Sequence, residues 1–339
     1  PRLVVLAGGE QSGKDIYIET PIPTPNGWVR MGDIKPHEYV FDENGEPTKV
    51  TGISQVWLDR ICYRITFDDG TSIIAGETHE WLTETSIDRK SRLRQKSDDG
   101  HGRINTVSVK ETRDIVKTLR ARIGQRAEHN NHSIDINGPL QYRTKELPID
   151  PYVLGAWLGD GYSKSAYICG IDQGIFDQIM DRGVSLERVG ETITYRMGPK
   201  VGRFRVMNQT LKDLGVFGNK HIPNIYLQGD YQQRLDLLRG LMDTDGYAKG
   251  KGTGTCEFYN TNIEIIEGVC ELLSSLGVKY RLRNKIARLY GKDCGLVYTV
   301  SFAATLMPFY LQRKIDKVKI STKDDFKRKY IVDIVEVES

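Results

Sequence analysis

The chain has 339 residues, of which 39% are hydrophobic, and this is enough for two or three domains with buried cores. Its formal net charge is small, +3, although the charge is unevenly distributed. No apolar run reaches membrane length, no secretory signal is visible, and the five widely spaced cysteines form no C-x-x-C pair. We therefore expect a cytoplasmic protein without a membrane partner, a disulfide framework or a zinc site.

The first fourteen residues contain most of a phosphate-binding loop. Gly8, Gly13 and Lys14 fit the pattern G-x-x-x-x-G-K, and the apolar run before them supplies the expected strand. The pattern needs Ser or Thr next, so that a hydroxyl can reach Mg²⁺, but Asp15 follows and prolines stand where the helix should begin. The loop is therefore interrupted after Lys14.

Residues 16–85 are predicted to form short β-strands, because β-rich runs such as Cys62 to Phe67 alternate with the turn sequences NGW, ENGEP and DDGTS. Residues 89–126 then carry twelve Lys and Arg against four Asp and Glu. This stretch either faces an acidic partner or is a solvated surface, as most charge runs are. Its last part, from about residue 109 to residue 126, is expected to be helical.

The sequence pattern changes near residue 148 from short strands to alternating helix and strand. Asp150 followed by Pro151 is a good N-cap and first position for a helix. After about Lys319 the sequence returns to strand-forming residues, KYIVDIVEVE. We therefore expect an α/β region between two β-rich segments.

The α/β region contains a repeat, VLGAWLGDG at Val153–Gly161 and LRGLMDTDG at Leu238–Gly246. Each copy is an apolar helical run that ends in Asp-Gly, and the two acids, Asp160 and Asp245, lie 85 positions apart. Small residues recur four apart on one helix face, where they let two backbones approach closely. Two such helices side by side would bring the acids together at their shared end. The small residues are Gly155 with Gly159 and Gly240 with Thr244.

Two carboxylates at the C-terminal ends of helices repel each other and the negative ends of the helix dipoles, so a cation between them is expected. Oxygen ligands with few other protein ligands suit Mg²⁺, which keeps waters and binds substrate phosphate. Divalent ions shared by two carboxylates favour phosphodiester cleavage. For either copy alone, the alternative is a helix that ends at a left-handed glycine cap. The matched pair favours the metal site.

Basic residues alternate along two stretches that are predicted to be strands. YRLRNK places Arg281, Arg283 and Lys285 on one face, and GRFRV does the same for Arg203 and Arg205. A basic sheet face can lie in the major groove of DNA, where phosphate contacts give affinity and base edges give sequence specificity. The alternative is a set of solvent-facing arginines.

The paired nonapeptides resemble the two LAGLIDADG motifs of a single-chain homing endonuclease. GNKHIP, at Gly218–Pro223, resembles the lysine block between these motifs in endonucleases that are embedded in inteins. The resemblance implies that Asp160 and Asp245 bind the metal and that Lys220 is a catalytic lysine. Lys314, in LQRKIDK, takes a roughly corresponding place in the second repeat, with an exposed structural lysine as the alternative.

The flanking β-rich segments resemble the splicing blocks of an intein. ETPIPTPNGWVRMGDI resembles the first block and places the splice junction at Asp15, AGETHEW resembles the block with the assisting histidine, His79, and YIVDIVEVE resembles the late block. In that block Asp333 takes the position that tunes the first nucleophile. Residues 1–14 would then be the end of the host protein, and VVLAGGEQSGK resembles the Walker loop of a phage large terminase subunit.

Three departures from the intein pattern predict a chain that does not splice. Asp15 has neither the thiol nor the hydroxyl that starts splicing. Gly76 replaces the usual Thr three positions before the block histidine, and the sequence stops at Ser339, before the His-Asn pair that ends an intein. A complementary C-terminal intein fragment is therefore an expected partner.

The predicted fold class is multidomain: an all-β, horseshoe-like Hint splicing domain and an α/β two-repeat LAGLIDADG endonuclease domain. The expected activity is Mg²⁺-dependent cleavage of double-stranded DNA, the intein-less host gene, by a monomer. Two other hypotheses stay open, a degenerate element that binds DNA without cutting it and an autoprocessing domain with a passive insert. The expected bounds are 1–14 for the host remnant, 15–147 and 320–339 for the splicing domain, and 148–319 for the endonuclease.

Overall fold

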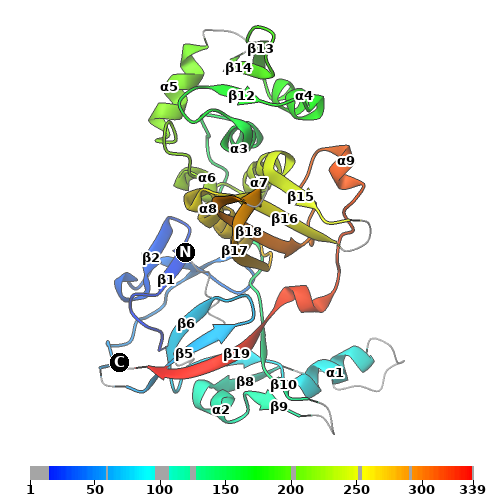
Figure 1. Ribbon diagram of the computed structural model, residues 1–339. Helices are drawn as coiled ribbons and strands as arrows, with labels where there is room; N and C mark the ends of the chain where they lie inside the picture. The colour runs from blue at the N-terminus through cyan, green and yellow to red at the C-terminus, as the bar shows by residue number, and fades with distance from the viewer. Residues whose placement is uncertain are drawn as a thin grey trace. The chain divides into compact units, whose positions relative to one another are not determined.

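The computed structural model describes residues 15–58, 60–95, 107–122, 127–199, 204–250, 254–289 and 292–337 (Figure 1). The chain divides into two compact units. One consists of Gln141–Thr322, and the other combines Arg2–Leu140 with Lys323–Ser339. We call them the inserted unit and the outer unit. In the described residues no helix combines the length and the apolar character needed to cross a membrane.

The inserted unit contains two successive α/β repeats. In the first, the strands form an antiparallel sheet in the order β12-β14-β13, and in the second the order is β15-β16-β18-β17. The elements of the first repeat are α3 (Pro151–Asp160), β12 (Tyr167–Cys169), α4 (Gln173–Asp181), β13 (Val184–Arg188), β14 (Thr194–Pro199), α5 (Arg205–Asp213) and α6 (Asn224–Leu227). Those of the second are α7 (Tyr231–Asp245), β15 (Gly246–Ala248), β16 (Thr255–Asn260), α8 (Ile263–Ser275), β17 (Tyr280–Leu289), β18 (Lys292–Ala303) and α9 (Gln312–Ile315).

The two helices that carry the sequence repeat begin at acidic N-caps. The Asp150 side chain accepts hydrogen bonds from the backbone N–H groups of Tyr152 (2.9 Å) and Val153 (3.3 Å), and Pro151 occupies the first turn, as the sequence predicts. At the start of α7, Asp230 and Gln233 form a reciprocal capping box. These caps fix where both helices start, and therefore where their last residues lie.

The predicted close packing of these helices is confirmed. A Cβ on Gly155 would collide with the Leu237 carbonyl oxygen, and a Cβ on Gly240 would collide with that of Tyr152. Gly159 faces the Thr244 side chain in the same way. Helices α3 and α7 therefore touch backbone to backbone along the face that the small residues mark, as Figure 1 shows for their neighbouring positions.

The glycines that end these helices are not left-handed caps. Gly161 has φ −81° and Gly246 has φ −88°, both in the extended region. Their small size matters instead, because a Cβ on Gly161 would strike Trp157 and one on Gly246 would strike Met242. The left-handed cap considered as an alternative for the Asp-Gly pairs is therefore wrong.

The outer unit is built mainly from short antiparallel strands, as predicted for residues 16–85. Its largest sheet has the order β11-β19-β5-β6, so that β19, which follows the inserted unit in sequence, lies between strands that precede it (Figure 1). The elements are β1 (Pro21–Thr24), β2 (Gly27–Arg30), η1 (Met31–Asp33), β3 (Tyr39–Phe41), β4 (Pro47–Lys49), β5 (Cys62–Phe67), β6 (Ser72–Gly76), β7 (Glu80–Thr83), α1 (Ser86–Gln95), β8 (Ser108–Glu111), α2 (Thr112–Lys117), β9 (Arg120–Ala121), β10 (His129–Asn130), β11 (Ser133–Asp135), η2 (Asp324–Lys327) and β19 (Arg328–Val337).

Each unit has its own hydrophobic core. The core of the inserted unit includes the fully buried Trp157 and Phe258, and that of the outer unit includes Ile65 and Ile331. Burying one such side chain stabilises a fold by roughly 1.5–3 kcal/mol relative to leaving it exposed. Ile331 of β19 shares this core with β5, so the segment after the inserted unit is part of the outer fold.

The helix expected from about residue 109 to residue 126 is wrong in extent. Of its described residues, 109–122, only Thr112–Lys117 is helical, and this helix lies between strands β8 and β9. Thr112 and Ile115 are the buried residues of this helix, so a helix of six residues is enough to cover the neighbouring core. The residues before the helix form strand β8, which pairs with β7.

Candidate functional site

The predicted acids are the last residues of α3 and α7, Asp160 and Asp245. Burial raises the pKa of both carboxyl groups, to about 6 for Asp245. The charge of Asp160 raises the pKa of Asp245 further, whereas Lys220 lowers it. The two acids end the helices that pack backbone to backbone, so the structure places them at a shared end, as the repeat predicts.

The C-terminal end of each acid-bearing helix accepts hydrogen bonds from a lysine, which is half-buried in the first repeat (Lys220) and buried in the second (Lys314). Lys220 Nζ donates to the carbonyl oxygens of Leu158 (3.0 Å), Gly159 (3.3 Å) and Gly161 (2.5 Å) at the end of α3. A positive charge here offsets the negative end of the helix dipole. It also supplies donors to carbonyl groups that have no partner within the helix.

Lys314 does the same for the second repeat. Its Nζ donates to the carbonyl oxygens of Met242 (2.8 Å), Asp243 (2.7 Å), Thr244 (3.5 Å) and Gly246 (2.7 Å). The side chain is 7% exposed, so the alternative of an exposed structural lysine is wrong. The weak sequence match at this position therefore marks a genuine structural counterpart of Lys220.

Burial sets the protonation behaviour of both lysines. It lowers the pKa of Lys220 and of Lys314 to about 8, while nearby acids, Asp245 for Lys220 and Asp243 for Lys314, raise it. Three backbone carbonyls accept from Lys220, which is the full donor capacity of an ammonium group. Both lysines are therefore bound to helix ends in the structure.

The two lysine-bearing segments are anchored crosswise. Asn262, the N-cap of α8 in the second repeat, donates through Nδ2 to the carbonyl oxygen of Lys220, at 2.7 Å. Arg313, beside Lys314, pairs with Asp172, the N-cap of α4 in the first repeat. Each repeat thus holds the lysine segment of the other, and these contacts were not predicted from the sequence.

The side chain of Asn260 contacts one of the two acids, Asp245. Asn260 Nδ2 donates to Asp245 Oδ2 at 3.1 Å. Asn260 is the last residue of β16, and its sequence neighbourhood contains no motif that marks it. Its contact with Asp245 follows from the tertiary structure, which places the end of β16 beside the end of α7.

The two carboxylates fit an Mg²⁺ ion whose other ligands are waters and substrate phosphate. Among the described residues no group of three or more His, Cys, Asp or Glu side chains is placed to hold a metal ion. Asp160 and Asp245 remain, two half-buried carboxylates whose repulsion a cation would relieve. Mg²⁺ commonly binds through one or two carboxylates together with waters and substrate phosphates. Asp160 and Asp245 therefore fit an Mg²⁺ ion that binds together with the substrate.

The predicted basic face is found in part. Arg281, Arg283 and Lys285 are exposed on β17 and pair with residues of β18. The opposite face of β17 is also open, since Leu282 is 40% and Ile286 is 56% exposed. The strand is therefore accessible from both sides.

The strand predicted for GRFRV is wrong. Arg205 is the first residue of helix α5, and Arg203 lies outside the described residues. Met207 and Leu211, spaced four apart, are the buried residues of this helix. The segment is helical because these two residues bury one helix face, and this outweighs the short alternating pattern of GRFRV.

In the outer unit, Asp15 and His79 lie close together, as the sequence predicts. The Asp15 carboxylate accepts a hydrogen bond from Thr78 Oγ1 at 3.0 Å and lies 3.9 Å from both His79 Nδ1 and an Arg60 nitrogen. Burial raises the pKa of Asp15. A Cβ on Gly76 would collide with this carboxyl group, so the glycine makes the space that Asp15 occupies.

The structure does not bring Asp333 to this site. Asp333 is exposed on β19 and pairs with Thr66, whereas Gly76, beside Asp15, pairs with Cys62. Four residues along β5 separate these rows, or about 13 Å at roughly 3.3 Å per residue. A bulge between Ile331 and Asp333 shifts the register of β19, and this shift cannot be inferred from the strand sequence.

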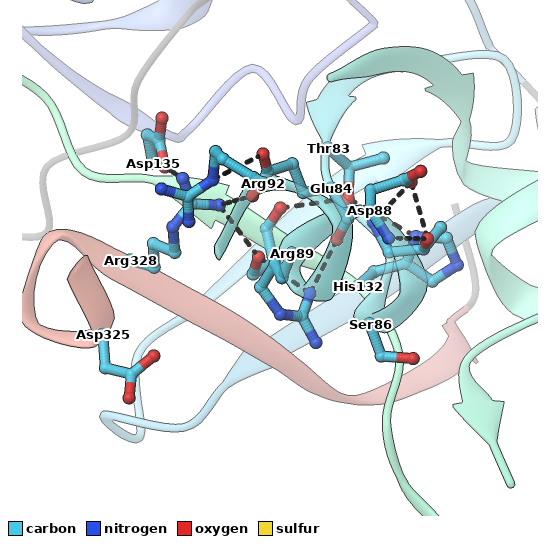
Figure 2. A network of polar contacts seen from close by, with 12 residues as sticks. Thr83, Glu84, Ser86, Asp88, Arg89, Arg92, His132, Asp135, Asp325 and Arg328 are labelled. Atoms are coloured by element: carbon cyan, nitrogen blue, oxygen red, sulfur yellow. Dashed lines mark hydrogen bonds and ion pairs between the residues drawn. The ribbon is translucent and has the colours of Figure 1, made fainter. Parts of the chain in front are cut away.

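A buried polar network joins β19 to the rest of the outer unit (Figure 2). Arg328 forms ion pairs with Glu84, which is 2% exposed, and with Asp135 at 3.0 Å. Arg92 Nε pairs with the same glutamate at 3.0 Å, and Arg89 donates to the Glu84 carbonyl oxygen at 2.8 Å. The network ties residues before and after the inserted unit together.

His132 lies in the same region. It is fully buried between Thr83 and Thr118, whose hydroxyls lie 3.4 Å from Nδ1 and 2.9 Å from Nε2. Burial lowers the pKa of His132 to about 4. The imidazole is therefore neutral and structural at physiological pH.

Residues 232–330 match the family described as LAGLIDADG-like domain. This range contains Asp245 and Lys314. The chain is also 35% identical over 315 residues to the replicative DNA helicase DnaB of Mycobacterium intracellulare. The match covers 92% of the chain but 51% of the helicase, so the chain spans about half the length of this relative.

Two solved structures are also similar. Part of the chain is 31% identical to a crystal structure of the MchDnaB-1 intein, with coverage of 28% of this chain and 72% of that one and a TM-score of 0.20. The identity over most of the solved intein, rather than the TM-score, shows the family. The chain belongs to the inteins. I-DmoI in complex with DNA and Ca is 16% identical over 45% of this chain and 82% of that one, with a TM-score of 0.29, too weak a likeness to carry any of its properties over.

This intein combines a β-rich splicing domain with a LAGLIDADG homing-endonuclease domain, as predicted. The phage terminase host expected from residues 1–14 is not supported, since the relative is a DnaB helicase. Residues 1–14 lie outside the described residues.

Proposed function

We propose that the inserted unit of this intein is a site-specific homing endonuclease that cleaves both strands of the intein-less host gene. The observation that carries the proposal is the pair of half-buried acids at the shared end of α3 and α7, each helix being held at that end by a lysine that donates to its carbonyl oxygens. Burial and mutual repulsion of two carboxylates cost stability, and a cation and a phosphate bound there would offset that cost.

Asp160 and Asp245 would hold Mg²⁺, which supplies an activated water and charge stabilisation for the scissile phosphodiester. The carboxylates must be ionised to do so, and with a pKa of about 6 Asp245 is mostly ionised at neutral pH. Lys220 and Lys314 neutralise the ends of the two helices, so that an anionic phosphate can approach. We assign them this electrostatic role because backbone carbonyls occupy their donors.

DNA would be bound by Arg281, Arg283 and Lys285 on β17, with Arg203 and Arg205 as further contacts. Phosphate contacts of this kind make affinity fall steeply with salt, with a log-log slope of roughly −0.9 per contact. Both repeats stand in one chain, so we propose that a monomer acts on both strands, in the cytoplasm where the host gene lies. A flat salt dependence would favour the passive-insert hypothesis.

The proposal is tested by plasmid cleavage, with the uninterrupted host gene as target and Mg²⁺ present. Asp160→Asn and Asp245→Asn should each abolish cleavage and leave DNA affinity within roughly tenfold, since they leave the basic strand intact. Asp177→Asn, an exposed acid on α4, is the matched control and should cut normally. A wild-type protein that binds the target but leaves it whole would establish the degenerate DNA-binding element instead.

For the splicing domain we propose that the junction between Lys14 and Asp15 stays intact. A carboxylate at this position is a poor nucleophile, and the expected tuning residue, Asp333, lies on a different part of the sheet. His79 remains the group that would polarise this peptide bond. A complementary C-terminal fragment is the partner that we propose for completing the domain. As host we propose only a protein with a Walker-type loop.

Intact mass after incubation with hydroxylamine tests this proposal, because hydroxylamine traps activated acyl groups. The chain should keep its first fourteen residues. Asp15→Cys, supplied with a peptide that completes the last strands, should become sensitive at this bond, and adding His79→Ala should slow cleavage by about 10²-fold or more. Ready cleavage of the unmodified chain would show that Asp15 is not an inert first residue.

A further inference from the structure

The two repeats of the inserted unit differ at one equivalent position. The N-caps Asp172 of α4 and Asn262 of α8 define the equivalence, since each anchors the lysine segment of the other repeat. Two residues before these caps stand Gly170 in the first repeat and Asn260 in the second. The repeat with the amide side chain is therefore the one that contains Asp245.

The hydrogen bonds of Asn260 fix the direction of its amide. Its Oδ1 accepts from the backbone N–H of Asn262 at 2.9 Å. Because a backbone N–H can only donate, the carbonyl oxygen must face Asn262, and the NH₂ group must face Asp245. The Nδ2 contact with Asp245 Oδ2, at 3.1 Å, is thus a directed hydrogen bond that restricts the rotation of this carboxylate.

Asp160 has no such support. Within the part of the chain that the structure describes, no side chain donates a hydrogen bond to its carboxylate, and Gly170 has no side chain to do so. The Gly170 N–H donates to the Ile193 carbonyl oxygen rather than to the acid. The two acids therefore share burial and a lysine-capped helix end but differ in how their oxygens are oriented.

We propose that Asn260 is a positioning residue that makes the two acids unequal, so that the DNA strand whose scissile phosphate lies nearer Asp245 is cut first. The inference rests on the proposed endonuclease function. A carboxylate that is already oriented loses less rotational freedom when it takes up its working geometry, and this favours cleavage beside Asp245. Asp160 must be oriented when substrate binds, so the strand nearer Asp160 is cut second.

The orientation can be tested without DNA or metal. In an ¹⁵N-labelled protein, the side-chain NH₂ resonances of Asn260, assigned through Asn260→Ala, should shift in Asp245→Ala and stay in place in Asp160→Ala. Equal shifts in both variants, or none in either, would show that the amide does not act on Asp245 specifically. Failure of the endonuclease proposal does not affect this readout.

Cleavage of a duplex labelled differently on its two strands tests the consequence, under single-turnover conditions with Mg²⁺. Wild type should nick one strand before the other. Asn260→Ala should slow that same strand roughly tenfold, the scale for one hydrogen bond to a charged group, and change the other less than about twofold. Asn224→Ala, an exposed amide on α6, is the control.

The complementary variant is Gly170→Asn. A Cβ at this position has ordinary van der Waals room, its nearest neighbour being a Phe176 ring atom at 3.7 Å. It should speed cutting of the second strand and reduce the nicked intermediate, which a merely structural role for Asn260 does not predict. Equal slowing of both strands in Asn260→Ala would overturn the inference and leave the function standing, whereas a wild type that cuts neither strand would overturn the function.

Discussion

The inserted unit and the outer unit both place an acidic side chain in a partly buried candidate site, but they do so in different ways. Asp160 and Asp245 stand on helix ends that pack backbone to backbone, so one contact along α3 and α7 fixes both. Asp15 lies beside the end of β6, His79 lies between β6 and β7, and Asp333 lies on β19, so their distances depend on strand register. A helix-borne site follows from local spacing, and a sheet-borne site follows from pairings between residues far apart in sequence.

The largest effect that we predict comes from widening the contact between the helices. Gly240→Ala should destabilise the inserted unit by more than about 4 kcal/mol, because the new Cβ meets the Tyr152 carbonyl and other backbone atoms of α3, which cannot move aside. Hydrogen exchange of peptides from α3 and α7 measures this loss. Gly170→Ala, where a Cβ has room, is the control, and similar exchange in both variants would contradict the packing argument.

The contact between α3 and α7 also shows which parts of the structure could be predicted from the sequence. The small residues four apart and the Asp-Pro cap are local patterns, and they predicted the helices, their mutual face and the meeting of the acids. The burial of Lys314 was not predictable in this way, since its carbonyl partners lie about seventy positions earlier in the chain. Asn260 and the crosswise caps likewise depend on contacts between repeats.

The outer unit should be most sensitive at the network of Figure 2. Arg328→Met should destabilise it by about 3 kcal/mol, because Glu84 would stay buried while losing a cationic partner. Arg64→Met, an exposed arginine on β5, is the matched control. Urea unfolding followed by hydrogen exchange in β5 and β19 is the measurement, and an unchanged midpoint would mean that the network does not hold the two segments together.

The strand-borne residues show where prediction from the sequence fails. KYIVDIVEVE was correctly predicted as a strand. Neither its bulge nor the pairing of Asp333 with Thr66 can be predicted from the sequence of that segment. The same holds for Arg205, where two buried residues of α5 override a short alternating pattern. In both places the tertiary partner decides, and it lies outside the segment that carries the pattern.

A smaller effect is expected from the pH dependence of the inserted unit. The pKa of Asp245 is about 6 in the fold, above its ordinary 3.8, so the folded state holds this proton more tightly than the unfolded chain does. Stability therefore falls as pH rises from about 4 through 6, and the cost is complete above that range. Asp245→Asn should remove it and stabilise the unit by about 3 kcal/mol at pH 7.

Thermal unfolding of wild type and Asp245→Asn at pH 4 and pH 7 checks the sign. The two proteins should be close in stability at pH 4 and differ at pH 7, with the variant the more stable although it cannot cut. Asp177→Asn should behave like wild type at both values, because Asp177 is exposed. A variant that is less stable than wild type at pH 7 would show that the acid is needed for folding rather than kept for function.

The smallest effect tests whether Asp15 and Gly76 are matched. Gly76→Ala brings a Cβ against the Asp15 carboxyl group, which is the end of a flexible side chain, so we expect a cost of only about 1 kcal/mol as the carboxylate turns away from Thr78. Asp15→Ser has a shorter side chain and should leave room for that Cβ. In a double-mutant cycle measured by urea unfolding, Gly76→Ala should therefore be nearly neutral in the Asp15→Ser background, with a coupling energy of about 1 kcal/mol. If Gly76→Ala costs the same in both backgrounds, the two departures from the intein pattern are independent. If they couple as expected, the loss of the block threonine and the loss of the first nucleophile are one structural change, since the space that the glycine leaves is filled by the carboxylate at the splice junction.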